Sequence, residues 1–295
     1  MSEAVSSPRV GLFGGLLASL WAEFRSWSPT LKAGSLMMLL ILAGAIFAPW
    51  ISGHDPYYQD FNAALEPPSL QHLFGTDSLG RDIFTRVLYG GRIDLQIGLI
   101  ATYVPMSYGV LLGALSGYVG GRLDAVVMRI LDIAMAFPFL VLIIVILAIL
   151  GPGVQNIYIS VFLVAWTMYA RLARAEMIVE RTKDYITAAK VLGFPTHRIV
   201  LRHGLPNVIN SSIVFSMSDF VLNILLVSGL SFLGLGIQPP TPEWGSMIAE
   251  GKDFILEAWW ICTLPGLVVV LTGTALSLIG DGFAQRLGER HHGFV

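Results

Sequence analysis

The chain has 295 residues, of which 55% are hydrophobic and only 13% are charged, and its mean hydropathy is +0.70. Soluble globular domains carry about a quarter charged residues, so this composition excludes an ordinary soluble domain and indicates a polytopic membrane protein. The formal net charge of −2 gives no reason to expect nucleic-acid binding, and a single cysteine, Cys262, excludes an internal disulfide framework.

Apolar residues recur at helical spacing near the start of the chain, from Leu12 to Phe24, but Glu23 and Arg25 interrupt them. A signal peptide needs an uninterrupted apolar run, so this stretch is unconvincing as one. Residues 1–30 are instead predicted to form a cytoplasmic amphipathic segment along the inner membrane surface.

A helix that crosses the hydrocarbon core of a membrane needs about 20 apolar residues. Windows of this kind predict an all-α fold with about six transmembrane helices, near residues 31–51, 93–119, 125–150, 157–174, 208–229 and 260–280. Pro138 is expected to kink the third span. Gly109, Gly113 and Gly117 form a stripe of small residues that favours close helix packing. The predicted organisation is the segment 1–30, a first span with an external loop over 31–92, a membrane core over 93–285 that includes a loop at 180–207, and a cytoplasmic tail over 286–295.

The basic residues predict the orientation of the chain. With the N-terminus in the cytoplasm, only Arg81, Arg86, Arg92 and Lys252 of the 18 Lys and Arg residues fall on external segments. The other fourteen fall on cytoplasmic segments, as the positive-inside rule requires. Both termini and the loop 180–207 are therefore expected on the cytoplasmic side.

The external loop ends in a run of small and charged residues before the second span, and the candidate residues are Gly75, Thr76, Asp77, Gly80, Arg81 and Asp82. Thr76 or Asp77 is expected to cap the following helix. Asp82 and Arg86 are four residues apart, which predicts a salt bridge on one helix face. A structural, capping or subunit-contact role is favoured over a catalytic role for the two aspartates.

The fifth span contains polar residues at a depth where they are costly, among them Ser216, Asp219 and Asn223. Such residues face a protein or aqueous interior rather than lipid. Two interpretations stay open here. The residues either line a solute path or contact a neighbouring helix or a partner subunit.

The segment 184–207, between the fourth and fifth spans, predicts two short helices joined by a turn. Gly193 can adopt the positive φ that ends the first helix, and Pro195 can begin the second. Leu205 and Pro206 are expected to stop the second helix before the chain re-enters the membrane. The candidate residues of this cytoplasmic knob are Asp184, Thr187, Ala188, Ala189, Gly193, Pro195, His203, Leu205 and Pro206.

This segment resembles the loop that defines the membrane subunits of bacterial ABC importers, whose pattern is E-A-A, three residues, Gly, nine residues and I-x-L-P. The chain departs from the pattern at Thr187, where the family often has Glu, and at His203, where it often has Ile. The run Phe-Gly-Thr-Asp-x-x-Gly-Arg-Asp from Phe74 to Asp82 is similar to the signature of the oligopeptide, dipeptide and nickel permease branch. The resemblance covers about residues 67–282.

The resemblance implies a type I importer permease in the bacterial cytoplasmic membrane, in contact with membrane lipid, that forms half of a translocation pathway for a peptide or similar small solute. The implied partners are a second, homologous permease chain, two ATP-binding subunits that engage the knobs, and a periplasmic or lipid-anchored solute-binding protein. ATP and Mg would be used by the partner subunits, and the chain itself would bind no cofactor or metal. The solute is left open among peptides, glutathione, opines, nickel chelates and glycosides.

Two other classes of function are weighed against this one. A secondary transporter driven by an ion gradient would use midplane ionisable groups, for which Asp219 is the candidate. An intramembrane enzyme would need a paired nucleophile and base or a metal set, and the sequence offers neither. The sequence also lacks a G-x-x-x-x-G-K-[ST] phosphate loop, so the chain is predicted not to hydrolyse ATP.

Overall fold

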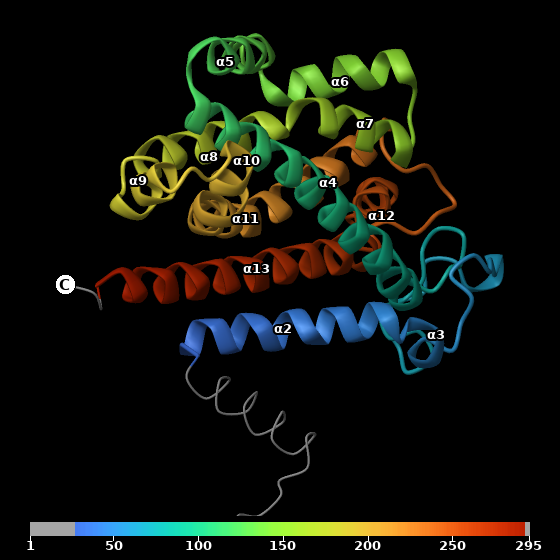
Figure 1. The fold of residues 1–295 in the computed structure, drawn as a ribbon. Helices are drawn as coiled ribbons and strands as arrows, with labels where there is room; N and C mark the ends of the chain where they lie inside the picture. Colours follow the sequence, from blue (N-terminus) through green and yellow to red (C-terminus); the bar gives the residue numbers. More distant parts are fainter. Residues whose placement is uncertain (1–26, 293–295) are drawn as a thin grey trace, which may run out of the picture.

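The computed structural model describes residues 27–292, and every regular element in that range is a helix (Figure 1). The predicted amphipathic stretch from Leu12 to Phe24 lies outside the described residues. The longer helices are α2 (Pro29–Ile46), α4 (Ile83–Val119), α5 (Gly121–Met135), α6 (Phe139–Leu150), α7 (Val154–Val164), α8 (Trp166–Glu180), α11 (Leu205–Phe232) and α13 (Trp260–His292). The shorter ones are α3 (Ala48–Ile51), η1 (Phe61–Ala63), α9 (Asp184–Val191), α10 (Thr196–Arg198), η2 (Ile199–Gly204), α12 (Trp244–Gly251) and η3 (Lys252–Phe254).

The predicted all-α membrane architecture is confirmed. Five helical stretches are long and apolar enough to cross a membrane, namely α2, α4, α7 with α8, α10 through α11, and α13. Together α5 and α6 would make a sixth, but they meet at an angle of 82°. The third predicted span, 125–150, is therefore not one straight helix. Pro138 lies at the break, where its missing N–H and its ring prevent the helix from continuing.

Several predicted boundaries fall inside helices, among them those at both ends of the membrane core 93–285. The second span begins at Ile83 rather than at residue 93, because the Asp82 carboxylate accepts a hydrogen bond from the Thr85 amide and caps α4 there. The expected tail 286–295 begins within α13, which runs on to His292.

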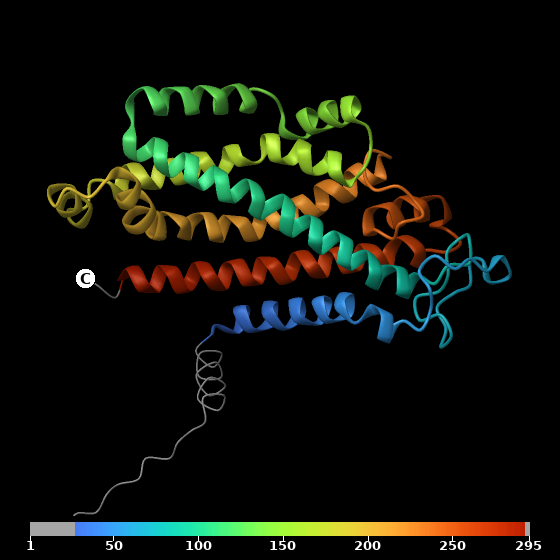
Figure 2. The ribbon, with the colours of Figure 1, turned by 45° about the vertical axis from the view of Figure 1, so that its right-hand side comes forward.

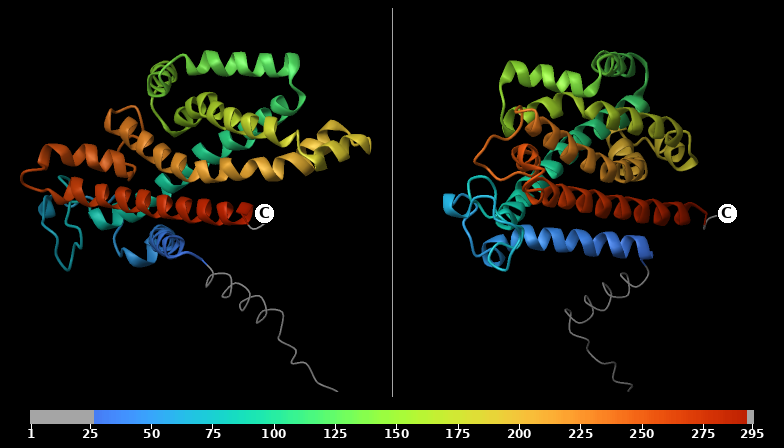
Figure 3. Two further views of the ribbon diagram at one scale, coloured as in Figure 1. Left: turned by 90° about the vertical axis from the view of Figure 1, so that its left-hand side faces the viewer. Right: turned by 180° about the vertical axis from the view of Figure 1, so that it is seen from behind.

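The helices form a bundle in which α13 packs between α2 and α11, as Figures 1 and 2 show from two sides. Helix α4 crosses the bundle obliquely and packs against α2, α8 and α11. Helices α5 and α6 lie on the opposite side of the bundle from α2, and Figure 3 shows the turn between them. This arrangement has two ends. We call the end that carries α9 and α10 the knob end, and the end that carries the loop 52–82 and α12 the loop end.

The most extensive helix contact is between α4 and α8, and it depends on the glycine stripe. A Cβ at Gly109 would lie 2.6 Å from the carbonyl oxygen of Trp166, and one at Gly117 would lie 2.7 Å from that of Arg174. A Cβ at Gly113 would overlap the backbone of Ala170. The glycines let the two backbones touch, which confirms the packing prediction.

Candidate functional site

The knob consists of α9, a turn at 192–195 and α10, and the predicted turn is confirmed. Gly193 has φ +77°, a conformation that glycine adopts without strain. The Gly193 amide donates to the Lys190 carbonyl and the Phe194 amide to the Ala189 carbonyl, which satisfies the last carbonyls of α9. Pro195 then occupies the N-cap position of α10.

The two alanines of the knob face in different directions. Ala189 is buried with Ile186 and Ile199 beneath the knob, whereas Ala188 is exposed. The tip exposes two large apolar side chains, Val191 at 83% and Leu192 at 71%. Neither was among the predicted site residues, because the sequence shows a Val-Leu pair before a turn glycine but not that the pair protrudes. Asp184, Thr187, Gly193 and Pro195 are also exposed, so the tip is an apolar surface with a polar margin.

Polar contacts connect the knob to α8 and α11, and the adjoining end of α8 to α4. Arg181, at the end of α8, donates to the Gly117 and Tyr118 carbonyls at the end of α4. The Tyr185 hydroxyl donates to the Glu180 carboxylate and accepts a hydrogen bond of 2.9 Å from Asn207 of α11. Burial and the bond to Glu180 raise the pKa of Tyr185, so its hydroxyl stays protonated. These contacts tie the knob directly to α8 and α11, and they tie the end of α8 to α4.

Leu205 and Pro206 do not stop a helix, contrary to the sequence prediction. The chain is helical without interruption from Thr196 to Phe232, with the π-helical turn η2 between α10 and α11. Pro206 stands in the first turn of α11, where a missing N–H is tolerated. His203 lies off the tip, stacked on Phe194 with the ring centroids 5.8 Å apart.

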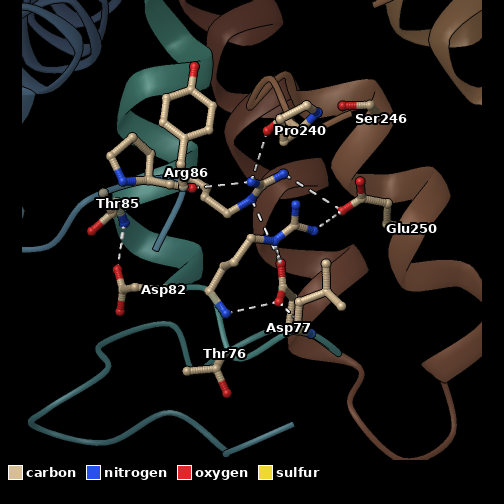
Figure 4. Close-up of polar contacts among 12 residues, drawn as sticks. Thr76, Asp77, Asp82, Thr85, Arg86, Pro240, Ser246 and Glu250 are labelled. Atoms are coloured by element: carbon tan, nitrogen blue, oxygen red, sulfur yellow. Dashed lines mark hydrogen bonds and ion pairs between the residues drawn. The ribbon is translucent and has the colours of Figure 1, made fainter. Parts of the chain in front are cut away.

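At the loop end, the predicted charged residues form a buried network (Figure 4). The Asp77 carboxylate accepts hydrogen bonds from the Arg81 amide and from Arg81 Nε, the latter at 2.6 Å. Arg81 also pairs with Glu250 of α12 at 2.6 Å. Thr76 accepts from the Glu66 amide, and its own carbonyl accepts from the Trp260 indole. The network joins the external-loop motif to α12 and α13, which supports the favoured structural role.

Two predicted contacts in this network are wrong. The helix cap is Asp82 rather than Thr76 or Asp77. Arg86 does not pair with Asp82. Asp82 is occupied by the Thr85 amide and by His72, and Arg86 instead lies 3.8 Å from Asp77 and 3.6 Å from Glu250. Glu250 was missed because it is remote in sequence and no local pattern connects it to the motif.

Gly75 and Gly80 both have positive φ and touch other backbone segments. A Cβ at Gly75 would lie 2.6 Å from the Glu66 carbonyl oxygen, and one at Gly80 would overlap the Asp60 carbonyl. The two glycines thus let the external loop fold back on itself.

Within the helices, two of the three predicted polar residues of the fifth span line a pocket. Asp219 and Asn223 are among the lining residues of a cavity of about 450 Å³ between α6, α8 and α11. Asp219 accepts hydrogen bonds from the Tyr169 hydroxyl and from Asn223, and Asn223 also donates to Thr102. Ser216 is buried and bonds the Ile213 carbonyl of its own helix. The structure thus places Asp219 and Asn223 at both a helix contact and a cavity wall.

Comparison with known proteins gives this architecture a family. The profile of the binding-protein-dependent transport system inner membrane component matches residues 109–291, more than half of the chain. The chain belongs to this family. The profile of the N-terminal TM domain of oligopeptide transport permease C matches residues 16–68. Between them the two profiles cover α2 and the membrane core from the middle of α4 onward, and they leave residues 69–108 unmatched.

Relatives match over nearly their full length. The chain is 40% identical to the di/tripeptide transport system permease protein DppC of Pseudomonas aeruginosa (strain UCBPP-PA14), over 98% of this chain and 97% of that protein. It is 40% identical to the probable D,D-dipeptide transport system permease protein DdpC of Escherichia coli (strain K12), over 90% and 89%. It is also 40% identical to the glutathione transport system permease protein GsiD of Escherichia coli O6:K15:H31 (strain 536 / UPEC), over 92% and 90%.

These matches confirm the predicted function at the level of the family. The chain is a multi-pass permease subunit of an ATP-driven, binding-protein-dependent ABC importer and works with ATPase and solute-binding partners. Membership of this family decides against a secondary transporter driven by an ion gradient. The family is one of transport permeases and not a family of enzymes.

Proposed function

We propose that this permease forms half of the translocation pathway of a peptide importer in the bacterial cytoplasmic membrane, with both termini in the cytoplasm. The other half comes from a second, homologous permease chain. Two ATP-binding subunits seat the two knobs and use ATP and Mg, and a periplasmic or lipid-anchored binding protein delivers the solute. The printed functions of the three relatives, which concern di- and tripeptides, D,D-dipeptides and glutathione, support a short peptide as the solute.

One observation carries the coupling role, namely an apolar tip on a knob that is tied to the long helices. Val191 and Leu192 are adjacent and largely exposed, and contiguous exposed apolar surface is typical of sites that contact a protein or a membrane. Closure of the ATPases on ATP would push this tip. Arg181 and the Tyr185–Asn207 bond would carry the displacement into α4 and α11. Switching between two packed arrangements then alternates access to the pathway.

The test replaces the tip residue Leu192 with Asp. A charge there cannot enter an apolar cleft without losing its hydration, so the Leu192→Asp chain should insert in the membrane but recover at most a tenth of the ATPase subunits on affinity purification. Gly193→Val should act in the same direction, because a β-branched residue is strained at φ +77°.

The matched control is Leu256→Asp. This leucine is 97% exposed at the loop end, so a charge there keeps its hydration. This variant should recover the ATPase subunits at the wild-type level. Wild-type recovery and uptake in Leu192→Asp would contradict the proposed role of the tip. Loss in both variants would mean that general damage, and not the tip, explains the effect.

A further inference from the structure

A stripe of residues at four-residue spacing winds along α11 through the bundle. The residues are Asn207, Ser211, Phe215, Asp219 and Asn223. Residues four apart are neighbours on the surface of an α-helix and each step turns about 40° around its axis, so the stripe is continuous and winds slowly around α11. It is polar at every position except Phe215, and it begins beside the knob and passes the middle of α11.

Two cavities open along this stripe, one on each side of Phe215. The first, of about 640 Å³, lies toward the knob end and is lined by polar residues that include Glu176, Asn207 and Ser211. The second is the cavity of about 450 Å³ that contains Asp219. Phe215 lines both of them. Its ring stands edge-on to the ring of Tyr169, with centroids 5.3 Å apart, and this contact holds Phe215 in place between the cavities.

The carboxylate in the second cavity lacks a positive partner in the described part of the chain. The hydrogen bonds from Tyr169 and from Asn223 both end on Asp219 Oδ2. Within residues 27–292, Oδ1 has no protein hydrogen-bond partner, and no Lys, Arg or His forms a salt bridge with Asp219. The other walls are mainly apolar and include Phe139, Met168 and Leu222. A carboxylate in such surroundings is costly unless a cation or a proton neutralises it.

We infer that Asp219 binds the protonated amino group of the solute, the α-ammonium of a peptide, while the solute crosses the membrane. This inference rests on the proposed peptide-import function and deepens it. Asp219 Oδ1 receives the ammonium, and Tyr169 and Asn223 hold the carboxylate in place through Oδ2. The apolar walls accept the side chains of a short peptide without selecting among them. Phe215 separates this subsite from the polar cavity at the knob end.

The experiment uses the intact importer, with both permease chains, the ATPases and the binding protein, in proteoliposomes. The probe is a mixture of di- and tripeptides, half of whose molecules are N-acetylated, and imported peptides are counted by mass spectrometry. Asp219→Asn keeps the size of the side chain and an oxygen for Tyr169 but removes the charge. It should lower the import of free-amine peptides at least tenfold and leave ATP hydrolysis stimulated by the binding protein within twofold of wild type.

The binding protein is the same in every sample, so a change in the ratio of free to acetylated peptide reports on the permease. Asp219→Glu should restore part of the free-amine import, because it restores the charge. The control is Thr274→Ala, which removes a hydroxyl that bonds only to its own helix α13, and this variant should import at the wild-type rate.

Three results would overturn the inference. The first is wild-type import of free-amine peptides by Asp219→Asn. The second is an equal loss of free and acetylated peptides in that variant, which would indicate a structural role. The third is failure of Asp219→Asn to recover the second permease chain, which would show that the carboxylate pairs with the partner subunit. Failure of the proposed function looks different, because the wild-type importer itself would then take up neither kind of peptide.

Discussion

Arg81 and Arg86 are both buried at the loop end, at 3% and 1% exposure, and they share the carboxylates of Asp77 and Glu250. Two guanidinium groups at this proximity repel each other, so each depends on the carboxylates between them. Arg86 also donates to the carbonyls of Pro56 and Pro240, which lie on two separate connecting segments. Charge balance in this cluster therefore fixes the relative positions of the external loop, α4 and α12.

Removal of one carboxylate should destabilise the chain strongly. Asp77→Asn keeps an oxygen for the amides of Leu79 and Arg81 but leaves two buried arginines with one carboxylate. Breaking a buried ion pair in this way costs about 3–5 kcal/mol. We expect that loss in the free energy of unfolding, measured by denaturant titration of the purified chain in detergent micelles.

An exposed ion pair provides the control. Asp132 lies 3.3 Å from Arg171, and both side chains are more than half exposed, so Asp132→Asn should change the free energy of unfolding by less than about 1 kcal/mol. Equal effects of the two substitutions would show that burial of the Asp77 cluster does not govern its contribution.

At the scale of the helices, the stripe on α4 sets the distance to α8. Gly113→Ala would drive a methyl group into the Ala170 backbone and force the helices apart. Gly229, in the helix α11, is a matched position, because a Cβ there meets nothing within 4 Å. Alanine is favoured over glycine in a helix by about 1 kcal/mol, so Gly229→Ala should be neutral or stabilising. Gly113→Ala should lower the thermal unfolding midpoint in the same detergent, and a similar shift in both variants would contradict the packing argument.

The sequence predicts elements well wherever the controlling signal is local. The apolar windows identify the spans, and Gly193 identifies the turn of the knob, because hydropathy and positive φ depend on neighbouring residues. The prediction that Leu205 and Pro206 stop a helix was wrong. A proline that follows the end of one helix and a proline in the first turn of the next look alike in sequence. The 82° angle between α5 and α6 was not predictable in size, because Pro138 breaks the helix but tertiary packing sets the direction of the second segment.

The candidate site residues divide in the same way between local sequence signals and contacts that depend on tertiary packing. Asp219 stands out in the sequence as an acid among apolar residues, but its partner Tyr169 lies on another helix, 50 positions away. Leu192 was not predicted because its exposure is what sets it apart, and hydropathy does not report exposure. Contacts between distant segments and the exposure of single side chains thus require the structure.

Across the whole molecule, the two ends differ in the charge that they present. At the loop end, Arg81 and Arg86 are buried and neutralised by carboxylates. At the knob end, Lys190, Arg198 and Arg202 are exposed. The count of basic residues already differs between the two ends. The difference in exposed positive charge is larger still, because Arg81 and Arg86 are buried and only exposed charge contacts the membrane surface. The knob end is thus the end expected in the cytoplasm.

This orientation can be tested with single cysteines in a Cys262→Ser chain. Leu70→Cys places a thiol on the external loop, at a position 99% exposed, and Leu192→Cys places one on the tip of the knob. A membrane-impermeant maleimide added to intact spheroplasts should modify the first thiol and leave the second unmodified. After the membrane is dissolved in SDS, both should react, which shows that the Leu192→Cys thiol is present and reactive. Labelling of the Leu192→Cys thiol in intact spheroplasts, with protection of the Leu70→Cys thiol, would show the opposite orientation. The knob would then be out of reach of cytoplasmic ATPases.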